Sequence, residues 1–567
     1  MTVPSASLDA TPIRWERYAL PGLVALVLAA TLSSITNGFA YDDIYIIVEN
    51  DRIHRLRDWM QFFQQAYWPF EDGVGLYRPL IILGYAVQWR VGGGAPLLFH
   101  LVNVALFLGI TLLVYRLLRR LAPTGAAWLG TAVFAVHPVH VEAIANVVGQ
   151  AELWGALFVL GAVDHFIATR QRGDLRPRDI AVLVGAFWIG LFTKEQVIVL
   201  PAVLLAAEVV LFARPRIPRN VWRTVGWMGL AALAYLLIRI DVLGAIGGDI
   251  PHPVFADSTP WMRLLMMLDA GPEWVRLLVW PARLYADYSP GQLIVHRTLS
   301  PSQGAGIAAL LALSALIVIA WQRARVAAFG LAFALLTLAP VTNILVATGI
   351  IIAERTLFLP TVGLALVVAS LTPAVRRWAQ RGGVWVPRAL IAVVAGLILA
   401  GAYRSSDRNT TWRDSPTVFA RLVKDAPLNF KAHYAFGGVM FKEQKGLDGE
   451  LEWRYALSIF PRNEDLHVLL ALKYKEVHRC ELAIPHFETA LAIEDDQPFG
   501  RIGYAACLLE LARFTDARLA ARQGLSYPKY RRAFRWMFDR ADSALVALDS
   551  SSGPHPGARR WVRQKAK

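Results

Sequence analysis

Two adjacent carboxylic acids, Asp42 and Asp43, lie in the stretch "FAYDDIYIIVEN", directly after the first long apolar run of the chain. A carboxylate near a membrane surface is well placed to take a proton from a hydroxyl group while that hydroxyl attacks an electrophilic carbon. Because neighbouring acids repel each other, such a pair can also share a cation. Taken alone, the pair is better explained as a solvated loop turn, so its chemistry depends on its surroundings.

Further ionisable residues border the apolar segments. They are His137, His140, Glu142 and Glu152 in "FAVHPVHVEAIANVVGQAELWGALF", Lys194 and Glu195 in "FTKEQ", Glu354 and Arg355 in "AERTLFLP", and Arg78 in "YRPL". Ionisable groups in or beside membrane spans are costly, so they tend to face a polar cavity and to mark function. For each residue alone, a satisfied contact between helices explains it equally well. Because the whole set is expected at one membrane face, a shared site is the better explanation.

The composition indicates a polytopic membrane protein. Of the 567 residues, 56% are hydrophobic, and the mean hydropathy is +0.41. Apolar runs long enough to cross a bilayer core of about 30 Å predict about eleven transmembrane helices. The runs are "YALPGLVALVLAATLSSIT", interpreted as an uncleaved first helix, and residues 97–117, 125–145, 150–168, 179–193, 197–213, 223–240, 305–321, 326–346, 356–374 and 385–402.

The basic residues predict the orientation of these helices. The net charge is +15, and the clusters "RLLRR", "TRQRGDLRPRD", "ARPRIPRN", "WQRAR" and "VRRWAQR" fall on the same side as Arg14 and Arg17 when the helices are counted alternately. Lys and Arg are enriched in cytoplasmic loops, so this side is expected to be cytoplasmic. Eleven crossings then place the acidic pair and everything after residue 403 on the outer face. Topology explains the charge without a nucleic-acid partner.

The tail contains a repeat. "YALSIFP" (455–461), "TALAIED" (489–495) and "QGLSYPK" (523–529) recur with a period of about 34 residues, which is typical of tetratricopeptide repeats. Small residues are expected where the helices cross: Ala432, Gly437, Ala456 and Ala490. Stacks of such helix pairs usually present a concave surface to a peptide or protein. The alternative is a helical tail that only caps the membrane domain.

These patterns predict three regions: a membrane domain at 1–403, a repeat domain at 404–548, and a basic, disordered end at 549–567 that contains "GARRWVRQKAK". Cys480 and Cys507 are the only cysteines, both in the tail. Two cysteines make neither a disulfide framework nor a cysteine metal cluster, and a bridge between them is not expected.

The order of the motifs resembles a known family. "YDDIYIIVEND", "YRPLIILGYAVQW", "LLFHLVNVALF", "FAVHPVHVEAIANVVGQAEL", "TKEQVIVLPAV" and "AERTLFLPTVG" follow one another before the repeats. This order is similar to that of the transmembrane and tetratricopeptide-repeat O-mannosyltransferases, which belong to the GT-C glycosyltransferase superfamily. The resemblance covers residues 37–370 and the repeats. The short repeat array fits a bacterial member, which places the chain in the inner membrane with its repeats in the periplasm.

The resemblance implies an all-α membrane helix bundle of the GT-C type with a C-terminal tetratricopeptide-repeat solenoid. It also implies transfer of a monosaccharide, mannose in the family, from a polyprenyl-phosphate donor with inversion at the anomeric carbon. The acceptor is expected to be a hydroxyl on a protein or peptide that the repeats bind, with a glycan or a lipid as alternative acceptors, and membrane lipid is a further partner.

Residue by residue, the resemblance places the family's acidic pair on Asp42 and Asp43, with Asp42 as the expected general base. A leaving lipid phosphate needs cationic or hydrogen-bonding partners. Arg355 is the first candidate for this role, and further substrate-binding candidates are Glu354, Lys194, Glu195, Arg78, His137 and His140. The chemistry requires no metal ion, and no other cofactor is implied. Some superfamily members use a divalent metal ion, for which Asp42, Asp43 and Glu152 are candidate ligands.

Two other classes of protein fit parts of the sequence. A non-catalytic membrane scaffold would use the repeats to recruit partners, but it leaves the acidic pair unexplained. A transporter for lipid-linked sugars predicts polar residues along a transmembrane path, whereas the polar residues here gather at one face.

Overall fold

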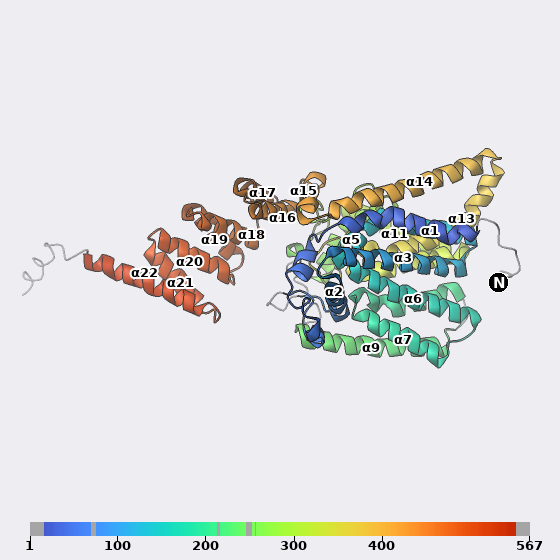
Figure 1. Cartoon of the computed structure of the whole chain (residues 1–567), viewed down its shortest axis with the longest axis horizontal. Coiled ribbons are helices and arrows are strands. Elements are labelled where there is room, and N and C mark those ends of the chain that lie inside the picture. The colour runs from blue at the N-terminus through green and yellow to red at the C-terminus, as the bar shows by residue number, and fades with distance from the viewer. Residues whose placement is uncertain (1–15, 70–74, 213–215, 245–251, 256, 552–567) are drawn as a thin grey trace, which may run out of the picture. The chain divides into compact units, whose positions relative to one another are not determined.

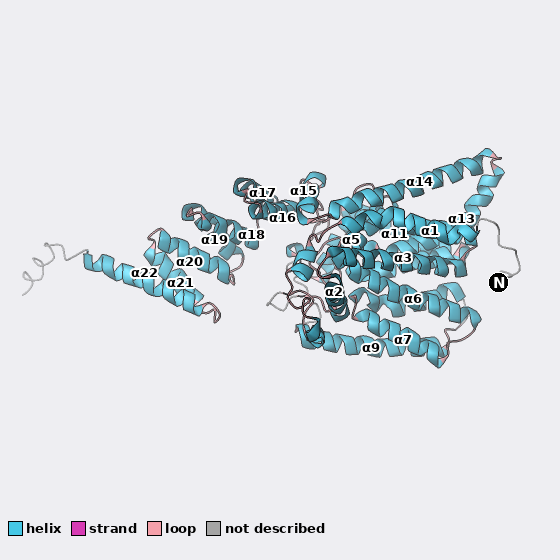
Figure 2. Cartoon of the chain, viewed as in Figure 1, coloured by secondary structure: helices cyan, strands magenta, loops and turns pink. Residues whose placement is uncertain are grey.

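The computed structural model describes residues 16–69, 75–212, 216–244, 252–255 and 257–551. Every regular element in these ranges is a helix (Figure 2), so the predicted all-helical fold class is confirmed. The chain divides into two compact units, Met1–Pro427 and Leu428–Lys567. The division falls later than the predicted boundary at 403. The helix that ends the membrane domain runs on to Asn409, and one more helix after it, Ser415–Asp425, belongs to the first unit. The predicted basic end lies mostly outside the described residues.

The first unit is a bundle in which neighbouring helices such as α3, α6, α7 and α9 run side by side (Figure 1). Its helices are α1 (Ala19–Thr31), α2 (Pro79–Gly92), α3 (Pro96–Leu121), α4 (Thr124–Ala135), α5 (Val141–Ala145), α6 (Gln150–Arg172), α7 (Pro177–Leu191), α8 (Leu200–Ala207), α9 (Arg219–Leu243), α10 (Pro260–Val279), α11 (Gln303–Arg323), α12 (Arg325–Leu338), α13 (Pro360–Arg381), α14 (Trp385–Asn409) and α15 (Ser415–Asp425).

Within the described ranges, eight helical segments are long and apolar enough to cross a membrane. A ninth span forms if the bent pair Thr124–Ala135 and Pro138–Ala145, which meet at 48°, is counted as one. The bend falls at Pro138, where the missing backbone N–H and the ring interrupt the helix. The other two of the eleven predicted spans are the helices α7 and α12. Each is shorter than the roughly 20 residues that a transmembrane helix needs.

Close helix packing fixes the start of α13, which follows the predicted site residues Glu354 and Arg355. Gly330 of α12 and Gly363 of α13 face each other, and a Cβ atom added to Gly363 would lie 2.3 Å from the carbonyl oxygen of Gly330. Small residues at such crossings allow helices to approach closely in a membrane, where packing drives association. The segment that carries Arg355 therefore enters a rigid part of the bundle.

The second unit consists of helix pairs. Its helices are α16 (Phe430–Lys442), α17 (Gly446–Ile459), α18 (Glu464–Glu476), α19 (Cys480–Ile493), α20 (Pro498–Glu510), α21 (Phe514–Gly524) and α22 (Arg531–Ser551). Corresponding helices begin at the predicted offset of about 34 residues. Asn429 and Asn463 occupy equivalent positions and cap their helices by accepting hydrogen bonds from the backbone N–H groups of Ala432 (2.9 Å) and Leu466 (2.8 Å).

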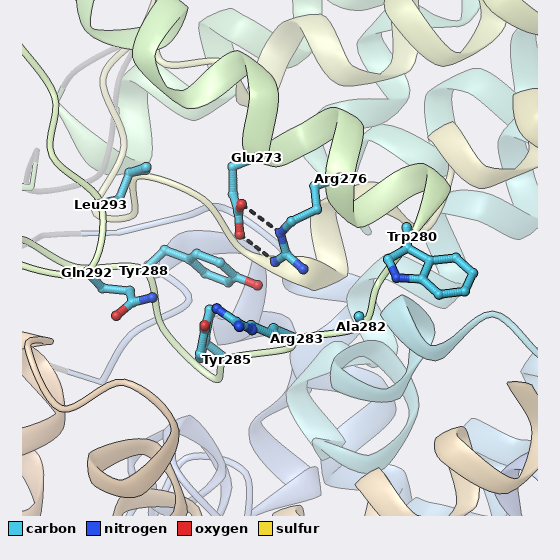
Figure 3. A pocket seen from close by; sticks show the side chains of 9 residues that line it. All are labelled: Glu273, Arg276, Trp280, Ala282, Arg283, Tyr285, Tyr288, Gln292 and Leu293. Atoms are coloured by element: carbon cyan, nitrogen blue, oxygen red, sulfur yellow. Dashed lines mark hydrogen bonds and ion pairs between the residues drawn. The ribbon is translucent and has the colours of Figure 1, made fainter. Parts of the chain in front are cut away.

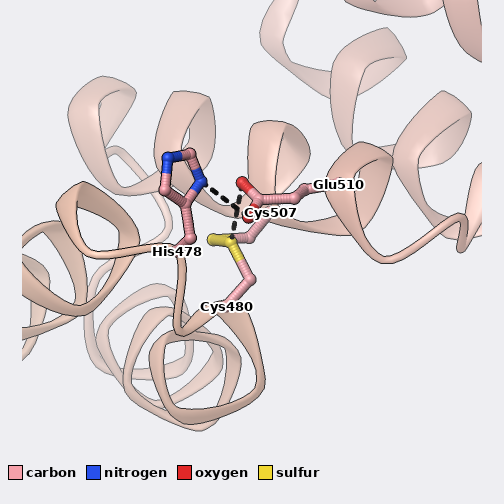
Figure 4. The surroundings of a disulfide bond; sticks show 4 residues. All are labelled: His478, Cys480, Cys507 and Glu510. Atoms are coloured by element: carbon pink, nitrogen blue, oxygen red, sulfur yellow. Dashed lines mark hydrogen bonds and ion pairs between the residues drawn. A yellow bond between two sulfur atoms is a disulfide. The ribbon is translucent and has the colours of Figure 1, made fainter.

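A disulfide joins Cys480 to Cys507 (Figure 4), so the expectation that these cysteines stay apart was wrong. Cys480 begins α19 and Cys507 lies near the end of α20. Successive helices of the stack run in opposite directions, which brings the start of one beside the end of the next. A bridge across a loop of this size contributes about 2–4 kcal/mol of stability, mainly by restricting the unfolded chain.

Candidate active site

Asp42, Glu142 and Arg355 form an ion cluster at one end of the first unit. Asp42 follows the first span, Glu142 lies in α5, and Arg355 lies in the short helix Glu354–Leu357 that leads into α13. The Arg355 Nη1 atom is 3.2 Å from Glu142 Oε1 and 3.7 Å from Asp42 Oδ2. The backbone N–H of Arg355 also donates to Glu142 Oε2 at 2.9 Å. Glu142 thus holds Arg355 at two points, and Asp42 makes the looser contact.

The three side chains differ in their access to solvent. The side chains of Asp42 and Arg355 are 21% and 19% exposed, whereas that of Glu142 is 3% exposed. Burial lowers the pKa of Arg355, but the carboxylates of Glu142, Asp42 and Glu152 outweigh that effect and raise it above its usual value. The cluster therefore presents one accessible carboxylate and one permanently charged guanidinium.

Asp43 points away from this cluster and is completely buried. Its carboxylate accepts hydrogen bonds from the backbone N–H groups of Val148 (2.8 Å), Ala40 (3.2 Å) and Val147 (3.3 Å). Burial raises the pKa of Asp43 to about 7, against the lowering effect of these N–H groups. Both of its oxygens are occupied by backbone donors, so Asp43 ties the loop to the segment before α6 and does not face the accessible side.

The residue before the two acids, Tyr41, has an unusual backbone conformation. Tyr41 has a φ of +59°, in the left-handed region that residues other than glycine rarely adopt. Its ring packs against Trp412 and Phe419, and its backbone N–H donates to Ser415 Oγ at 3.0 Å. Strain of this kind persists only where the surroundings enforce it, and it is frequent at functional sites.

A second ion network contains four of the predicted site residues. Lys194 pairs with Glu152. Arg78 donates from Nε and Nη2 to Glu195 at 3.0 and 2.8 Å, and Arg239 of α9 donates to the other Glu195 oxygen at 3.2 Å. The negative charge of Glu152 acts on Arg355 as well, which links the two groups electrostatically. Sequence reasoning missed Arg239, although an arginine within the apolar run "AYLLIRIDVL" carries the same signal as the residues it selected.

His137 and His140 do not contact Asp42 or Arg355. His140 lies among the rings of Phe107, Phe134 and Phe358, with Nε2 2.7 Å from Thr361 Oγ1. His137 Nε2 is 3.1 Å from the carbonyl oxygen of Leu278. Both histidines therefore serve as polar contacts between helices, which was the alternative explanation for each residue.

The three acids proposed as metal ligands do not converge. Asp42 faces Arg355, Asp43 is saturated by backbone N–H groups, and Glu152 pairs with Lys194. Among the described residues, no three His, Cys, Asp or Glu side chains are grouped as a metal site would require. This donor set does not fit a divalent cation.

The chain is 24% identical over 498 residues to protein O-mannosyl-transferase TMTC3 of Mus musculus, an alignment that covers 81% of this chain and 53% of the mouse protein. It is 26% identical over 492 residues to TMTC4 of Homo sapiens, covering 77% of this chain and 64% of that protein. Tmtc2 of Drosophila melanogaster is 30% identical over 315 residues, or 53% of this chain and 33% of the fly protein. This chain is similar to the protein O-mannosyl-transferases. The family resemblance of its motifs is thereby confirmed.

The chain spans about half the length of mouse TMTC3. No protein-family model matches it. Among solved structures, an Archaeoglobus fulgidus oligosaccharyltransferase tethered with an acceptor peptide aligns with a TM-score of 0.41 and 15% identity, covering 79% of this chain and 60% of that one.

In this O-mannosyl-transferase relative, Glu354 faces away from the ion cluster. Glu354 Oε1 accepts hydrogen bonds from the Tyr288 hydroxyl at 2.9 Å and from the backbone N–H of Tyr285 at 2.5 Å. Burial raises the pKa of Glu354 to about 8, against the opposing charge of Arg408 and with the added effect of Glu142. The two tyrosines carry no sequence signal that would have singled them out.

We expect the stability of the first unit to depend on the titration of Glu354. Its pKa rises from 4.5 to about 8 on folding, so the folded state keeps a proton that the unfolded state loses, and the unfolding free energy falls as the pH rises through this window. The substitution Glu354→Gln mimics the protonated acid. Between about pH 5 and pH 9 the thermal midpoint of the wild type should fall by about 2 °C or more relative to this variant.

The exposed Glu49→Gln is the matched control for this measurement and should follow the wild-type curve. Parallel curves for wild type and Glu354→Gln would show that Glu354 is ionised throughout.

Proposed function

We propose that this chain is a membrane glycosyltransferase that transfers a monosaccharide from a polyprenyl-phosphate donor to a hydroxyl group of a protein. The observation that carries the proposal is the contact between Asp42 and Arg355, an accessible carboxylate and an accessible guanidinium 3.7 Å apart. The reaction needs these two groups, a base for the acceptor hydroxyl and a cation for the leaving phosphate. Similarity to the protein O-mannosyl-transferases supports the same reaction class and suggests mannose as the sugar.

The proposed step is a single displacement. The proton of the acceptor hydroxyl moves to the Asp42 carboxylate as the hydroxyl oxygen forms a bond to the anomeric carbon. The bond from that carbon to the phosphate oxygen breaks, and the phosphate leaves with the electron pair. Attack opposite the leaving phosphate inverts the configuration at the anomeric carbon.

Arg355 stabilises the charge that develops on the leaving phosphate. A guanidinium can donate two parallel hydrogen bonds to phosphate oxygens, and such charge-assisted bonds are among the stronger ones in proteins. When the donor binds, its phosphate takes the place of Asp42 beside Arg355, which frees the carboxylate to act as base. Glu142 is the positioning residue, because its two contacts hold Arg355 whether or not Asp42 is engaged.

The site is proposed to face the outer side of the membrane, which in a bacterium is the periplasmic side of the inner membrane. The basic loops support this orientation. The Cys480–Cys507 disulfide supports it independently, because disulfides persist in oxidising compartments and are rare in the cytosol. The helical repeats would then lie on the same side as Asp42 and present a protein acceptor to it.

The orientation can be tested by labelling and proteolysis. In sealed vesicles and spheroplasts, we expect protease added from the outer side to cleave within residues 428–551 and a cysteine placed in "WQRAR" to react only from the cytoplasmic side. A cysteine placed in the outer loop "ATGIII" is the matched control and should react from the outer side. Cleavage of the repeats only from the cytoplasm would separate them from the site and overturn the arrangement.

The function itself can be tested in cells. Mass spectrometry of outer-face proteins from strains with and without the gene should show hexose-modified peptides that disappear in the deletion and return with the wild-type gene. They should not return with Asp42→Asn expressed at the same level. Identical glycopeptide profiles in all strains would favour a non-catalytic scaffold. If the modified peptides return with Asp42→Asn, the protein acts without this site.

A further inference from the structure

A cavity beside the candidate active site has no role in the proposed chemistry so far. It has a volume of about 420 Å³ and is formed by the second half of α10 and the loop that follows (Figure 3). Its lining includes Glu273, Arg276, Arg283, Tyr285, Tyr288 and Gln292. The volume lies in the range of about 300–1,000 Å³ that is usual for small-molecule sites.

Two of the charged residues of the cavity, Glu273 and Arg276, form an ion pair. Arg276 donates from Nε and Nη2 to the two oxygens of Glu273 at 2.8 and 2.5 Å, as Figure 3 shows. The third guanidinium nitrogen, Nη1, is buried and has no hydrogen-bond partner in the described part of the chain. A buried donor without a partner is costly, so Nη1 marks a position where a ligand oxygen would be bound.

Aromatic rings supply the rest of the lining. The rings of Tyr285 and Tyr288 meet edge to face, with centroids 5.3 Å apart, and Figure 3 shows Tyr288 between Glu273 and Tyr285. Trp280 also lines the cavity and is largely exposed. Aromatic walls with a few fixed donors and acceptors suit a ligand that has an apolar face and several hydroxyl groups.

The two guanidinium groups of the cavity differ. Arg283 is exposed, whereas the carboxylate of Glu273 neutralises Arg276, so that Arg276 offers directed hydrogen bonds more than net positive charge. The carboxylate of Glu273, the guanidinium of Arg276 and the amide of Gln292, which all line the cavity, provide both acceptors and donors. Vicinal hydroxyls of a pyranose ring need this combination, because each hydroxyl donates one bond and accepts others.

The cavity is linked to the ion cluster through Glu354 and the residue that follows it, Arg355. Tyr285 and Tyr288 both donate to Glu354, and the next residue, Arg355, contacts Asp42. A ligand that fills the cavity therefore lies against the tyrosines that contact Glu354, the residue next to Arg355 in the chain.

We propose that this cavity binds the monosaccharide ring of the donor. Glu273, Arg276 and Gln292 form hydrogen bonds with its hydroxyls, and the tyrosines pack on its C–H face. This inference rests on the proposed function and names the site within it that distinguishes sugars. Arg355 would recognise the phosphate of any polyprenyl-phosphate lipid, whereas the cavity would recognise only lipids that carry a sugar.

The test compares a polyprenyl-phosphate hexose, prepared with mannose, glucose or galactose, with sugar-free polyprenyl phosphate. Binding of each lipid to the purified full-length protein is measured by native mass spectrometry. Glu273→Gln and Gln292→Leu should weaken binding of the preferred sugar lipid by about 10-fold or more and leave binding of polyprenyl phosphate unchanged. Gln292→Leu keeps the Glu273–Arg276 pair, so it also controls for loss of that pair. Glu49→Gln, on the exposed surface, should change neither.

Equal weakening of both lipids would show an anion site and overturn the proposal, as would unchanged binding of the sugar lipid. If the wild type binds neither lipid, the proposed function fails, and the cavity is then tested alone with the methyl glycosides of the three sugars by saturation-transfer NMR. Absence of a signal, or a signal that persists in Glu273→Gln, would overturn the sugar site.

Discussion

Asp42→Asn is expected to reduce transfer by at least about 100-fold, because an amide keeps the shape of the side chain but cannot accept the acceptor proton. The measurement is the rate of sugar transfer by purified protein at matched levels of folded enzyme. Donor binding should be retained, since the phosphate contact is assigned to Arg355. Asp51→Asn is the matched control, because Asp51 lies in the same outer segment and is exposed; it should keep wild-type activity.

Asp43→Asn should behave differently from Asp42→Asn. At least one backbone N–H that now donates to Asp43 would face an amide NH₂ group, which costs about 1–3 kcal/mol of stability. We therefore expect a lower thermal midpoint with transfer less affected per folded molecule. Near-normal activity of Asp42→Asn would remove Asp42 as the base.

Arg355→Lys is expected to lose most of the transfer activity, and Arg355→Ala nearly all of it. A lysine keeps the charge but lacks the planar fork that can donate to two phosphate oxygens while the same side chain also pairs with Glu142. Both variants should weaken binding of polyprenyl phosphate, with or without a sugar, more than binding of an acceptor protein to the repeats. Native mass spectrometry with the sugar-free lipid measures this directly.

The exposed Arg57→Lys serves as the matched control for Arg355 and should leave lipid binding and transfer unchanged. Equal binding of polyprenyl phosphate by wild type and Arg355→Ala would remove Arg355 from the site, and its partners Glu142 and Asp42 would then make an ion network that only stabilises the bundle.

The sequence was sufficient to select Asp42 and Arg355, because charged residues beside apolar spans are rare and expensive. It could not show that they meet. Their contact depends on α5 and on the entry to α13, which the facing glycines Gly330 and Gly363 bring into a packed bundle. No local pattern encodes a contact between residues so far apart in the chain.

The sequence also could not predict that Asp42 and Asp43 have different partners. Asp43 accepts hydrogen bonds from backbone N–H groups far along the chain, at Val147 and Val148, and nothing in "AYDD" predicts those contacts or the left-handed backbone at Tyr41. The Cys480–Cys507 bridge was missed for a related reason. The number and spacing of the cysteines do not show that α19 and α20 pack antiparallel, although the repeat period can be recognised in the sequence.

The most direct test of the central claim is a transfer reaction with purified components. Wild-type protein in lipid nanodiscs is given a polyprenyl-phosphate hexose labelled in the sugar and a mixture of outer-face proteins from the deletion strain as acceptors. The account predicts labelled protein in which the sugar is bonded to a hydroxyl oxygen with inverted anomeric configuration, and release of polyprenyl phosphate. Asp42→Asn, which should still bind the donor, should yield neither product. Transfer at the wild-type rate by Asp42→Asn, or no transfer by a wild-type protein that binds the donor, would contradict the account.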